Sequence, residues 1–262
     1  MKQVINLALV AIMSMSMSMT SCMSVNIGNG DVDKTPTQIQ EINQLTTMQP
    51  FDEVDIAGPF KVIYEQSNEH SVRVEASEQA LKEMTVYVKD GELRIRKAVH
   101  KPTVSLKDVK IYVTSPVIDM IELAGSGMFA ASNPITVNKD LDVEIAGSGN
   151  VLLTAVTCHE SALEIAGSGN IEIGNLSADE VTTEIAGSGN INLGSMTCKK
   201  LKAEIAGSGD INCNNINADN VDVDIAGSGN VNLKGTVRNH TKDIAGSGKV
   251  NIINNTADNT IQ

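Results

Sequence analysis

Short runs of alternating apolar and polar residues recur along the chain from about residue 120 onward. In one run Ile171 and Ile173 flank a polar residue, and in another Ala203 and Ile205 do the same. Strict alternation over a few residues predicts a strand with one face buried and the other in water. Gly, Asn and Ser separate the runs, so each repeat of the pattern predicts two or three short strands joined at tight corners.

The runs are tied to an Ala-Gly-Ser-Gly motif that occurs seven times. Its alanine lies at positions 124, 146, 166, 186, 206, 226 and 245, so successive copies are 22, 20, 20, 20, 20 and 19 residues apart. A constant period of this length, without room for a helix, is typical of a solenoid in which each repeat is one coil. We therefore predict an all-β fold, a parallel β-helix with coils of about 20 residues. The general handedness of parallel crossovers indicates that it is right-handed.

The glycines of the motif are predicted to turn the chain at a corner of each coil, because glycine accepts a positive φ and crowded packing. The predicted corner glycines are Gly147, Gly149, Gly167, Gly169, Gly187, Gly189, Gly207, Gly209, Gly227 and Gly229. Two functional alternatives need features that the motif lacks. A phosphate-binding loop needs a helix after its glycines, and a nucleophile elbow needs Gly-x-Ser-x-Gly.

An acidic residue stands two positions before the alanine of every motif. Alternation predicts that these side chains point outward and form a column along the stack. A solvated acidic face is the favoured interpretation, because the pattern of alternating Gly and Asp in calcium-binding solenoids is absent. A metal site, with Ca²⁺ as the one cofactor left open, would use Glu144, Glu164, Glu184, Glu204 and Asp224.

A second outward column follows the motif directly. It consists of Asn150, Asn170, Asn190, Asp210, Asn230 and Lys249. Asn amides that are stacked in register can hydrogen-bond along a parallel sheet. This column is therefore predicted to stabilise the stack rather than to bind a ligand.

The N-terminal segment has the features of an export signal. Residues 1–21 contain Lys2, then an uncharged Met-rich apolar stretch, and then small residues before Cys22. This pattern predicts a lipoprotein signal peptide with lipidation at Cys22, which would anchor the protein in a membrane. An ordinary secretory signal is the alternative. The polar residues 22–46 are predicted to form a tether.

Between the tether and the repeats, the strand pattern is less regular. Residues 47–116 are predicted to form a β-rich region of modified first coils that caps the regular β-helix at 117–255. Within this region Asp90-Gly91 indicates a hairpin turn, and EQALKEM indicates one short helix. Residues 256–262 are predicted to form a polar tail.

Composition and charge restrict the functions that the sequence allows. A net charge of -12 disfavours nucleic acid as a partner. Phe129 is the only aromatic residue of the repeats, so stacking on sugar rings is poorly served. The four histidines are dispersed, and the protein is not predicted to be an enzyme. The equivalent coil positions of Cys158 and Cys198 are too far apart for a disulfide, and these residues and Cys213 are predicted to be small core residues.

The stretch FDEVDIAGPFKVIYEQ leads through VKIYVTSPVIDMIELAGSG into coils that repeat IAGSGN. Over about residues 47–255 this succession resembles the head GIN domain family of auto-transporter adhesins. The resemblance implies a β-helix related in shape to pectin lyases but without their catalytic residues. It also implies a role in adhesion at the bacterial cell envelope, and it transfers no ligand residues.

Pattern and resemblance together predict an exported, non-catalytic lipoprotein with an adhesive or structural role. Its expected partners are a membrane, through the lipid anchor, and an envelope or host glycan or protein, but not nucleic acid. The expected location is the outer membrane, on either its periplasmic or its surface face. The sequence does not decide between these faces or indicate the oligomeric state. The alternatives are a glycan-binding or carbohydrate-active β-helix and a cation-dependent surface scaffold.

Overall fold

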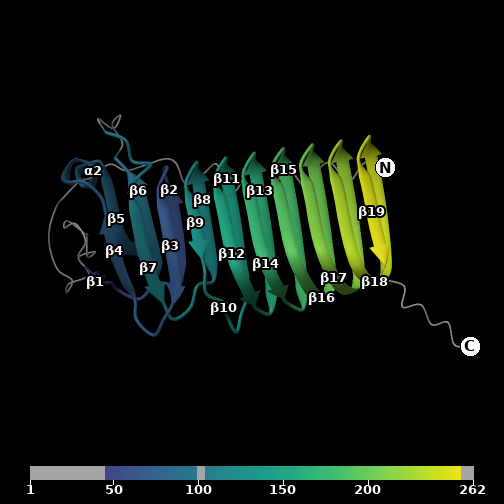
Figure 1. The fold of residues 1–262 in the computed structure, drawn as a ribbon, viewed down its shortest axis with the longest axis horizontal. Coiled ribbons are helices and arrows are strands. Elements are labelled where there is room, and N and C mark those ends of the chain that lie inside the picture. The colour runs from purple at the N-terminus through teal and green to yellow at the C-terminus, as the bar shows by residue number, and fades with distance from the viewer. Residues whose placement is uncertain (1–44, 99–103, 255–262) are drawn as a thin grey trace, which may run out of the picture. The chain divides into compact units, whose positions relative to one another are not determined.

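The structure is a computed structural model that describes residues 45–98 and 104–254. These residues form a parallel β-solenoid, with strands side by side along one axis (Figure 1). The predicted fold class is confirmed: about seven turns of about 20 residues follow an N-terminal region of mixed strands. The predicted signal peptide, the polar tail and all but the end of the predicted tether lie outside the described residues.

The N-terminal region contains seven strands and one short helix among its described residues. They are β1 (Leu45–Thr47), β2 (Glu53–Ala57), β3 (Lys61–Gln66), β4 (Ser71–Glu75), α2 (Glu78–Lys82), β5 (Met84–Lys89), β6 (Glu92–Lys97) and β7 (Lys110–Ser115). The strands of the repeats are β8 (Met120–Gly125), β9 (Met128–Ala131), β10 (Ile135–Thr136), β11 (Leu141–Gly147), β12 (Asn150–Thr157), β13 (Glu160–Gly167), β14 (Asn170–Ser177), β15 (Glu180–Gly187), β16 (Asn190–Gly207), β17 (Asp210–Gly227), β18 (Asn230–Gly246) and β19 (Lys249–Asn254).

Successive coils pair in parallel and in register. Ile165 lies opposite Ile185, which lies opposite Ile205 in the next coil. A register shift between Cys213 and Ile216 lets β17 pair with β18, whose repeat is one residue shorter. Because identical sequence positions stack on one another, each face of the solenoid presents columns of equivalent side chains.

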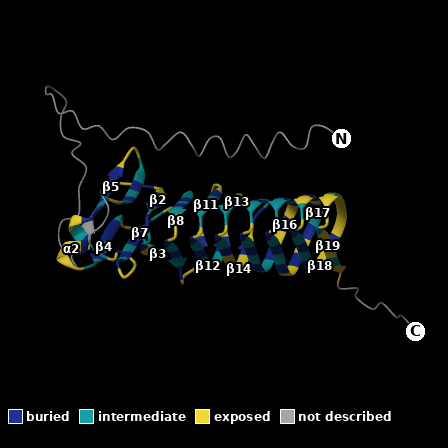
Figure 2. Ribbon diagram, turned by 90° about the horizontal axis from the view of Figure 1, so that it is seen from above, coloured by how far each residue is buried: buried dark blue, intermediate teal, exposed yellow. Residues whose placement is uncertain are grey.

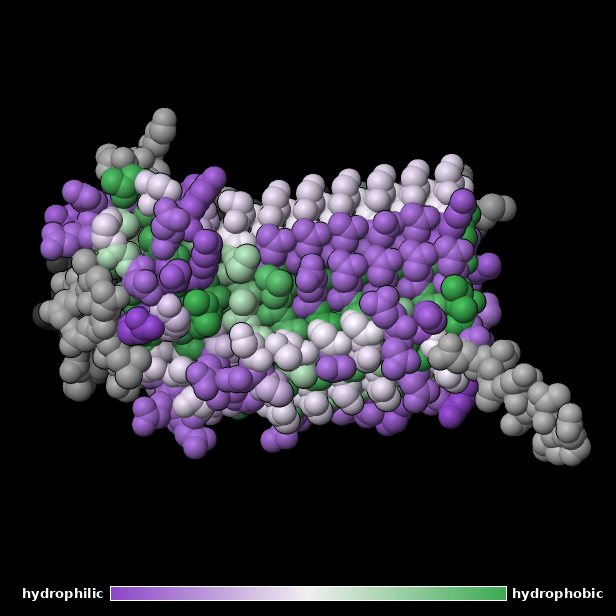
Figure 3. Space-filling model, in the orientation of Figure 1, coloured by the Kyte–Doolittle hydropathy of each residue, from purple (hydrophilic) through white to green (hydrophobic). Residues whose placement is uncertain are grey.

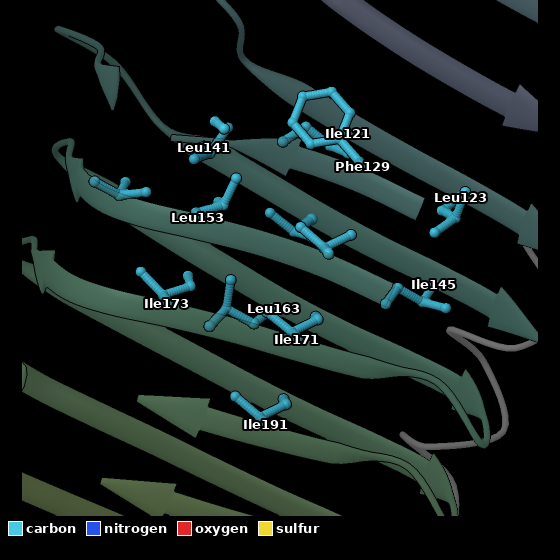
Figure 4. Close-up of a cluster of buried hydrophobic side chains, with 14 of the residues drawn as sticks. Ile121, Leu123, Phe129, Leu141, Ile145, Leu153, Leu163, Ile171, Ile173 and Ile191 are labelled. Carbon is cyan, nitrogen blue, oxygen red and sulfur yellow. The ribbon is translucent and has the colours of Figure 1, made fainter. Parts of the chain in front are cut away.

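The core consists of columns of aliphatic side chains that point into the solenoid from each coil. Figure 4 shows part of it, with Leu123 and Ile145 from one pair of neighbouring strands and Ile171 and Ile191 from another. These four residues are fully buried. Burying an aliphatic side chain contributes about 1.5–3 kcal/mol, so stacking supplies the stability that a single coil lacks.

The N-terminal region stacks its strands in an order that differs from their order in the chain. Strand β2 pairs with β8 and β3 pairs with β9, so β2 and β3 form the coil next to the repeats. Strands β6 and β7 then pair with the outer edges of β2 and β3. The antiparallel strands β4 and β5 cover β7 and β6 in turn. The antiparallel strands β4 and β5 therefore close the N-terminal end of the solenoid.

Two local predictions for this region are confirmed. Asp90 has φ 57° and, with Gly91, turns the chain between the antiparallel strands β5 and β6. Helix α2 begins after Ser77, whose hydroxyl accepts a hydrogen bond from the Ala80 N–H at 3.1 Å. Aromatic side chains supply bulk here, since Tyr64 stacks on Phe129 with ring centroids 5.7 Å apart.

At the other end, the last coil interrupts two of the apolar columns. His240 and Lys242 occupy the register positions that Val221 and Val223 hold in the coil before, and both are exposed. Exposed residues gather at this end of the solenoid in Figure 2, where they are yellow. Charged residues at inward positions make an edge unsuitable for further stacking.

Candidate functional site

The acidic column runs along one face of the solenoid, as alternation indicates. Glu144 lies opposite Glu164, and Glu164 lies opposite Glu184, with one carboxylate on each coil. Their side chains are half-buried, so they lose part of their hydration. Desolvation, followed by repulsion between neighbouring carboxylates, raises the pKa of Glu144 and of Glu184, and desolvation also raises that of Glu164.

The N-terminal end of this column meets a cluster of opposite charges. Arg96 donates hydrogen bonds to both oxygens of Asp55, which lies opposite Glu122. Arg94 pairs with Glu92 at 2.6 Å. Burial, with repulsion from Asp55 and then Glu144, raises the pKa of Glu122 to about 7 in spite of Arg96. Glu122 therefore changes its charge near neutral pH.

The acidic column does not gather its carboxylates into a chelating group. Among residues 45–98 and 104–254, no set of three or more His, Cys, Asp or Glu side chains is arranged to hold a metal ion. Each of the candidates Glu144, Glu164, Glu184, Glu204 and Asp224 stands on its own coil, in single file. Protonation of neighbouring carboxylates relieves the same repulsion that a cation would relieve.

The glycines of the motif occupy crowded corners. Gly167 has φ +137°, and a Cβ on it would lie 2.3 Å from the carbonyl oxygen of Gly147 in the previous coil. A Cβ on Gly169 would meet the carbonyl oxygen of Gly149 at 2.7 Å and Cγ2 of Ile145 at 2.6 Å. Both glycines are therefore needed for the close stacking of the coils, and the first is needed for its positive φ as well.

The predicted asparagine column forms a hydrogen-bonded ladder. Nδ2 of Asn170 donates to Oδ1 of Asn150 at 2.9 Å, and Nδ2 of Asn190 donates to Oδ1 of Asn170 at 3.1 Å. Asp210 continues the ladder by accepting from Nδ2 of Asn230 at 2.8 Å. The prediction that stacked amides bond along the sheet is confirmed.

A second ladder, which the sequence analysis missed, lies two residues further along the same strands. Asn212 donates to Asn192 at 2.9 Å, Asn232 donates to Asn212 at 2.9 Å, and Asn251 donates to Asn232 at 2.8 Å. The same spacing of about 20 residues reveals it in the sequence. The column contains Leu152 and Glu172 in earlier coils, which obscured the pattern.

A groove follows the second ladder along the solenoid, and we call it the ladder groove. It has a volume of about 1210 Å³ and is lined from Ala130 in β9 to Ile253 in β19. Its lining includes the column with Asn192 and Asn212 and the next corner with Gly174 and Gly194. Figure 3 shows rows of hydrophilic side chains running across successive coils beside a line of apolar atoms.

Ion pairs brace another corner of the coils. Lys139 pairs with Asp119 at 3.7 Å, and Lys199 pairs with Asp179 at 2.9 Å. His159 lies between carboxylates, with Nε2 3.8 Å from Oδ2 of Asp179. Apart from Asp119, which is partly buried, these side chains are exposed, so the pairs among them contribute little to stability. They form a charged surface at this corner of the solenoid.

The cysteines have the surroundings of core residues. Cys198 and Cys213 are buried and Cys158 is half-buried, and all three are free thiols. Burial raises the pKa of Cys158 to about 11 and that of Cys198 to about 12. The thiols are therefore protonated at neutral pH and are poor nucleophiles.

The lipidation candidate Cys22 lies outside the described residues. Across the described part of the chain, no helix combines the length and apolar character that a membrane-spanning segment requires.

Comparison with protein families identifies the relatives of this solenoid. The model of a family described as "Putative auto-transporter adhesin, head GIN domain" matches residues 50–215 and 197–261. The chain belongs to this family. The head GIN domain therefore includes both the N-terminal mixed region and the repeats, and the resemblance recognised in the sequence is confirmed.

Solved structures share the head GIN domain fold. A "putative adhesin" from Bacteroides fragilis is 22% identical with a TM-score of 0.72, covering 84% of this chain and 98% of its own. A "putative adhesin" from Parabacteroides distasonis is 22% identical with a TM-score of 0.69, at the same coverage. A "putative lipid binding protein" from Parabacteroides distasonis is 26% identical with a TM-score of 0.70, again covering 84% and 98%. The comparison with curated proteins gives no match.

The family description names adhesion and no catalytic activity. This description fits a protein of the cell surface or envelope. The solved structures share the β-solenoid of this head GIN domain.

Proposed function

We propose that this head GIN domain protein is a non-catalytic adhesin of the bacterial cell envelope. The observation that supports this function best is the ladder groove, which continues over successive coils instead of closing into a pocket. A catalytic pocket brings a few reactive side chains together, whereas a continuous groove on a stacked scaffold suits an extended partner. The family description points in the same direction.

The proposal includes a lipid anchor. Signal-peptide cleavage before Cys22 would leave its thiol available for acylation, and acyl chains would hold the solenoid at the outer membrane. Residues between Cys22 and β1, which begins at Leu45, would then serve as the tether. Cys22→Ser should move the protein from the membrane fraction to the soluble fraction, which immunoblotting of fractionated cells measures.

Adhesion itself is tested with the mature chain coupled to beads. We expect the beads to retain envelope fragments or intact bacterial or host cells, and beads coated with an unrelated acidic protein should retain far fewer. Equal retention by both kinds of bead would refute an adhesive function. Because the mature chain is used, the result is independent of the lipid anchor.

The acidic column supports a second candidate, a surface scaffold that cations stabilise. Half-buried carboxylates stacked on successive coils, such as Glu144 and Glu164, repel one another, and a bound cation would reduce that repulsion. Thermal unfolding with millimolar CaCl₂ and with EDTA separates the two functions. A Tm that is much higher with CaCl₂ than with EDTA would favour the cation-stabilised scaffold. Equal Tm values in the two conditions would favour the adhesin without a cation site.

A further inference from the structure

The ladder groove has the dimensions of a site for a polymer. It touches seven successive coil strands: β9, β12, β14, β16, β17, β18 and β19. Neighbouring strands are about 4.8 Å apart, so the groove extends about 29 Å along the solenoid. A compact small molecule would fill a fraction of that length, whereas an extended chain would contact every coil.

The amides of the groove are held in fixed directions. In the ladder from Asn192 to Asn251, each link uses one N–H of one amide and one lone pair of the next. An Asn amide has two N–H donors and an oxygen with two lone pairs, so a donor and an acceptor are left over on the inner members Asn212 and Asn232. The ladder orders these side chains before a ligand arrives, which lowers the entropy that binding costs.

The charge of the groove differs from that of the whole protein. Among the described residues of its lining, Glu172 and Lys234 are the charged ones, and their charges cancel, while the chain as a whole has a net charge of -12. None of these described lining residues is aromatic. A polyanion would be repelled by the acidic protein, and a polycation would find a better partner in the acidic column on another face. A neutral polymer rich in hydroxyl groups is the chemistry that the lining fits.

We propose that the ladder groove binds a neutral, unbranched polysaccharide that lies extended along the solenoid axis. This inference rests on the proposed adhesive function and names its ligand class. Hydroxyl groups of successive sugar units meet the amides of successive coils, and Gly174 and Gly194 belong to the same lining. Affinity then grows with the number of coils that the glycan spans.

Two matched double variants of the mature chain test the proposal. The groove variant combines Asn212→Leu with Asn232→Leu, and Leu is compatible with this column because Leu152 occupies it in β12. The control variant combines Asn170→Leu with Asn190→Leu in the other ladder, which does not line the groove. Each pair removes three ladder hydrogen bonds. Their structural cost is therefore similar.

The probes are cellohexaose and fully N-acetylated chitohexaose, the corresponding trisaccharides, and hexagalacturonate as the anionic counterpart, measured by isothermal titration calorimetry. We expect at least one neutral hexasaccharide to bind, and to bind more tightly than its trisaccharide. The loss of two hydrogen-bonding amides should weaken this binding by about tenfold or more in the groove variant. The control variant should bind like the wild type. Circular dichroism confirms that both variants are folded.

Three results would overturn the inference: no binding of either neutral hexasaccharide, equal weakening in both variants, or tighter binding of hexagalacturonate. If they occur while beads coated with the protein still retain cells, the ligand assignment fails and the adhesive function stands. If the hexasaccharide binds but the beads retain no cells, the groove is a glycan site and the adhesive function fails.

Discussion

Glu122 gives the structure's most direct link between charge and stability. Its pKa rises from 4.5 to about 7 because of burial and the nearby carboxylates of Asp55 and Glu144. A raised carboxyl pKa favours the protonated form in the folded state. The stabilisation is therefore complete below pH 4.5 and is lost as the pH rises through about 7. The substitution Glu122→Gln keeps the neutral form at every pH.

The size of the effect follows from the shift. Each pKa unit corresponds to about 1.4 kcal/mol of free energy. The full shift of the Glu122 pKa would therefore change the free energy of unfolding by about 3.4 kcal/mol. Glu122 is only half-buried, and solvent screening reduces this to about 1–2 kcal/mol. We expect Glu122→Gln to match the wild type near pH 4.5 and to be more stable by that amount at pH 8.5.

Urea unfolding followed by circular dichroism, at constant ionic strength from pH 4.5 to 8.5, measures the difference. Ser188→Ala is the control because it removes an exposed corner hydroxyl without changing the charge. Its stability relative to the wild type should be the same at all pH values. A pH-independent difference for Glu122→Gln, or a larger advantage at pH 4.5, would refute the account of this column.

Three further variants, two single and one double, test the packing and the C-terminal end of the solenoid. Ile185→Asp places a charge in a fully buried position and should lower the free energy of unfolding by about 3–5 kcal/mol in urea titrations. Gly207→Ala should destabilise by about 1–3 kcal/mol in the same assay, since φ is +143° and the Cβ would lie 2.1 Å from a carbonyl oxygen of the previous coil. Unchanged stability in either variant would contradict the stacking geometry. The double change His240→Val and Lys242→Val restores the apolar columns at the C-terminal end, and sedimentation should show more self-association than in the wild type at equal concentration; identical sedimentation would mean that these residues do not limit stacking.

The chemistry of the outward columns was only partly predictable. The ladder through Asn170 follows from its constant spacing, but the ladder through Asn212 was missed because Leu152 and Glu172 begin its column. The single-file acidic column was foreseen as well. Its raised pKa values were not, because they depend on how far each carboxylate is desolvated and which charges surround it.

The β-solenoid follows from the amino-acid sequence alone. A period of about 20 residues sets the coil, alternation decides which side chains face inward, and glycine at the corners permits close stacking. These are local properties that recur in every repeat. Neighbouring coils therefore pair in the same register. Even the bulge near Cys213 follows from one repeat that is one residue shorter.

The construction of the two ends and the position of the ladder groove depend on the folded stack of coils. Strands β6 and β7 stack outside β2 and β3, against the order of the chain, because edge pairing depends on long-range contacts that no periodic pattern encodes. The charge of Glu122 depends likewise on Asp55 and Arg96, which are distant in sequence and adjacent in the sheet. The groove exists because many coils align their corners, and alignment over that distance is a property of the assembled stack.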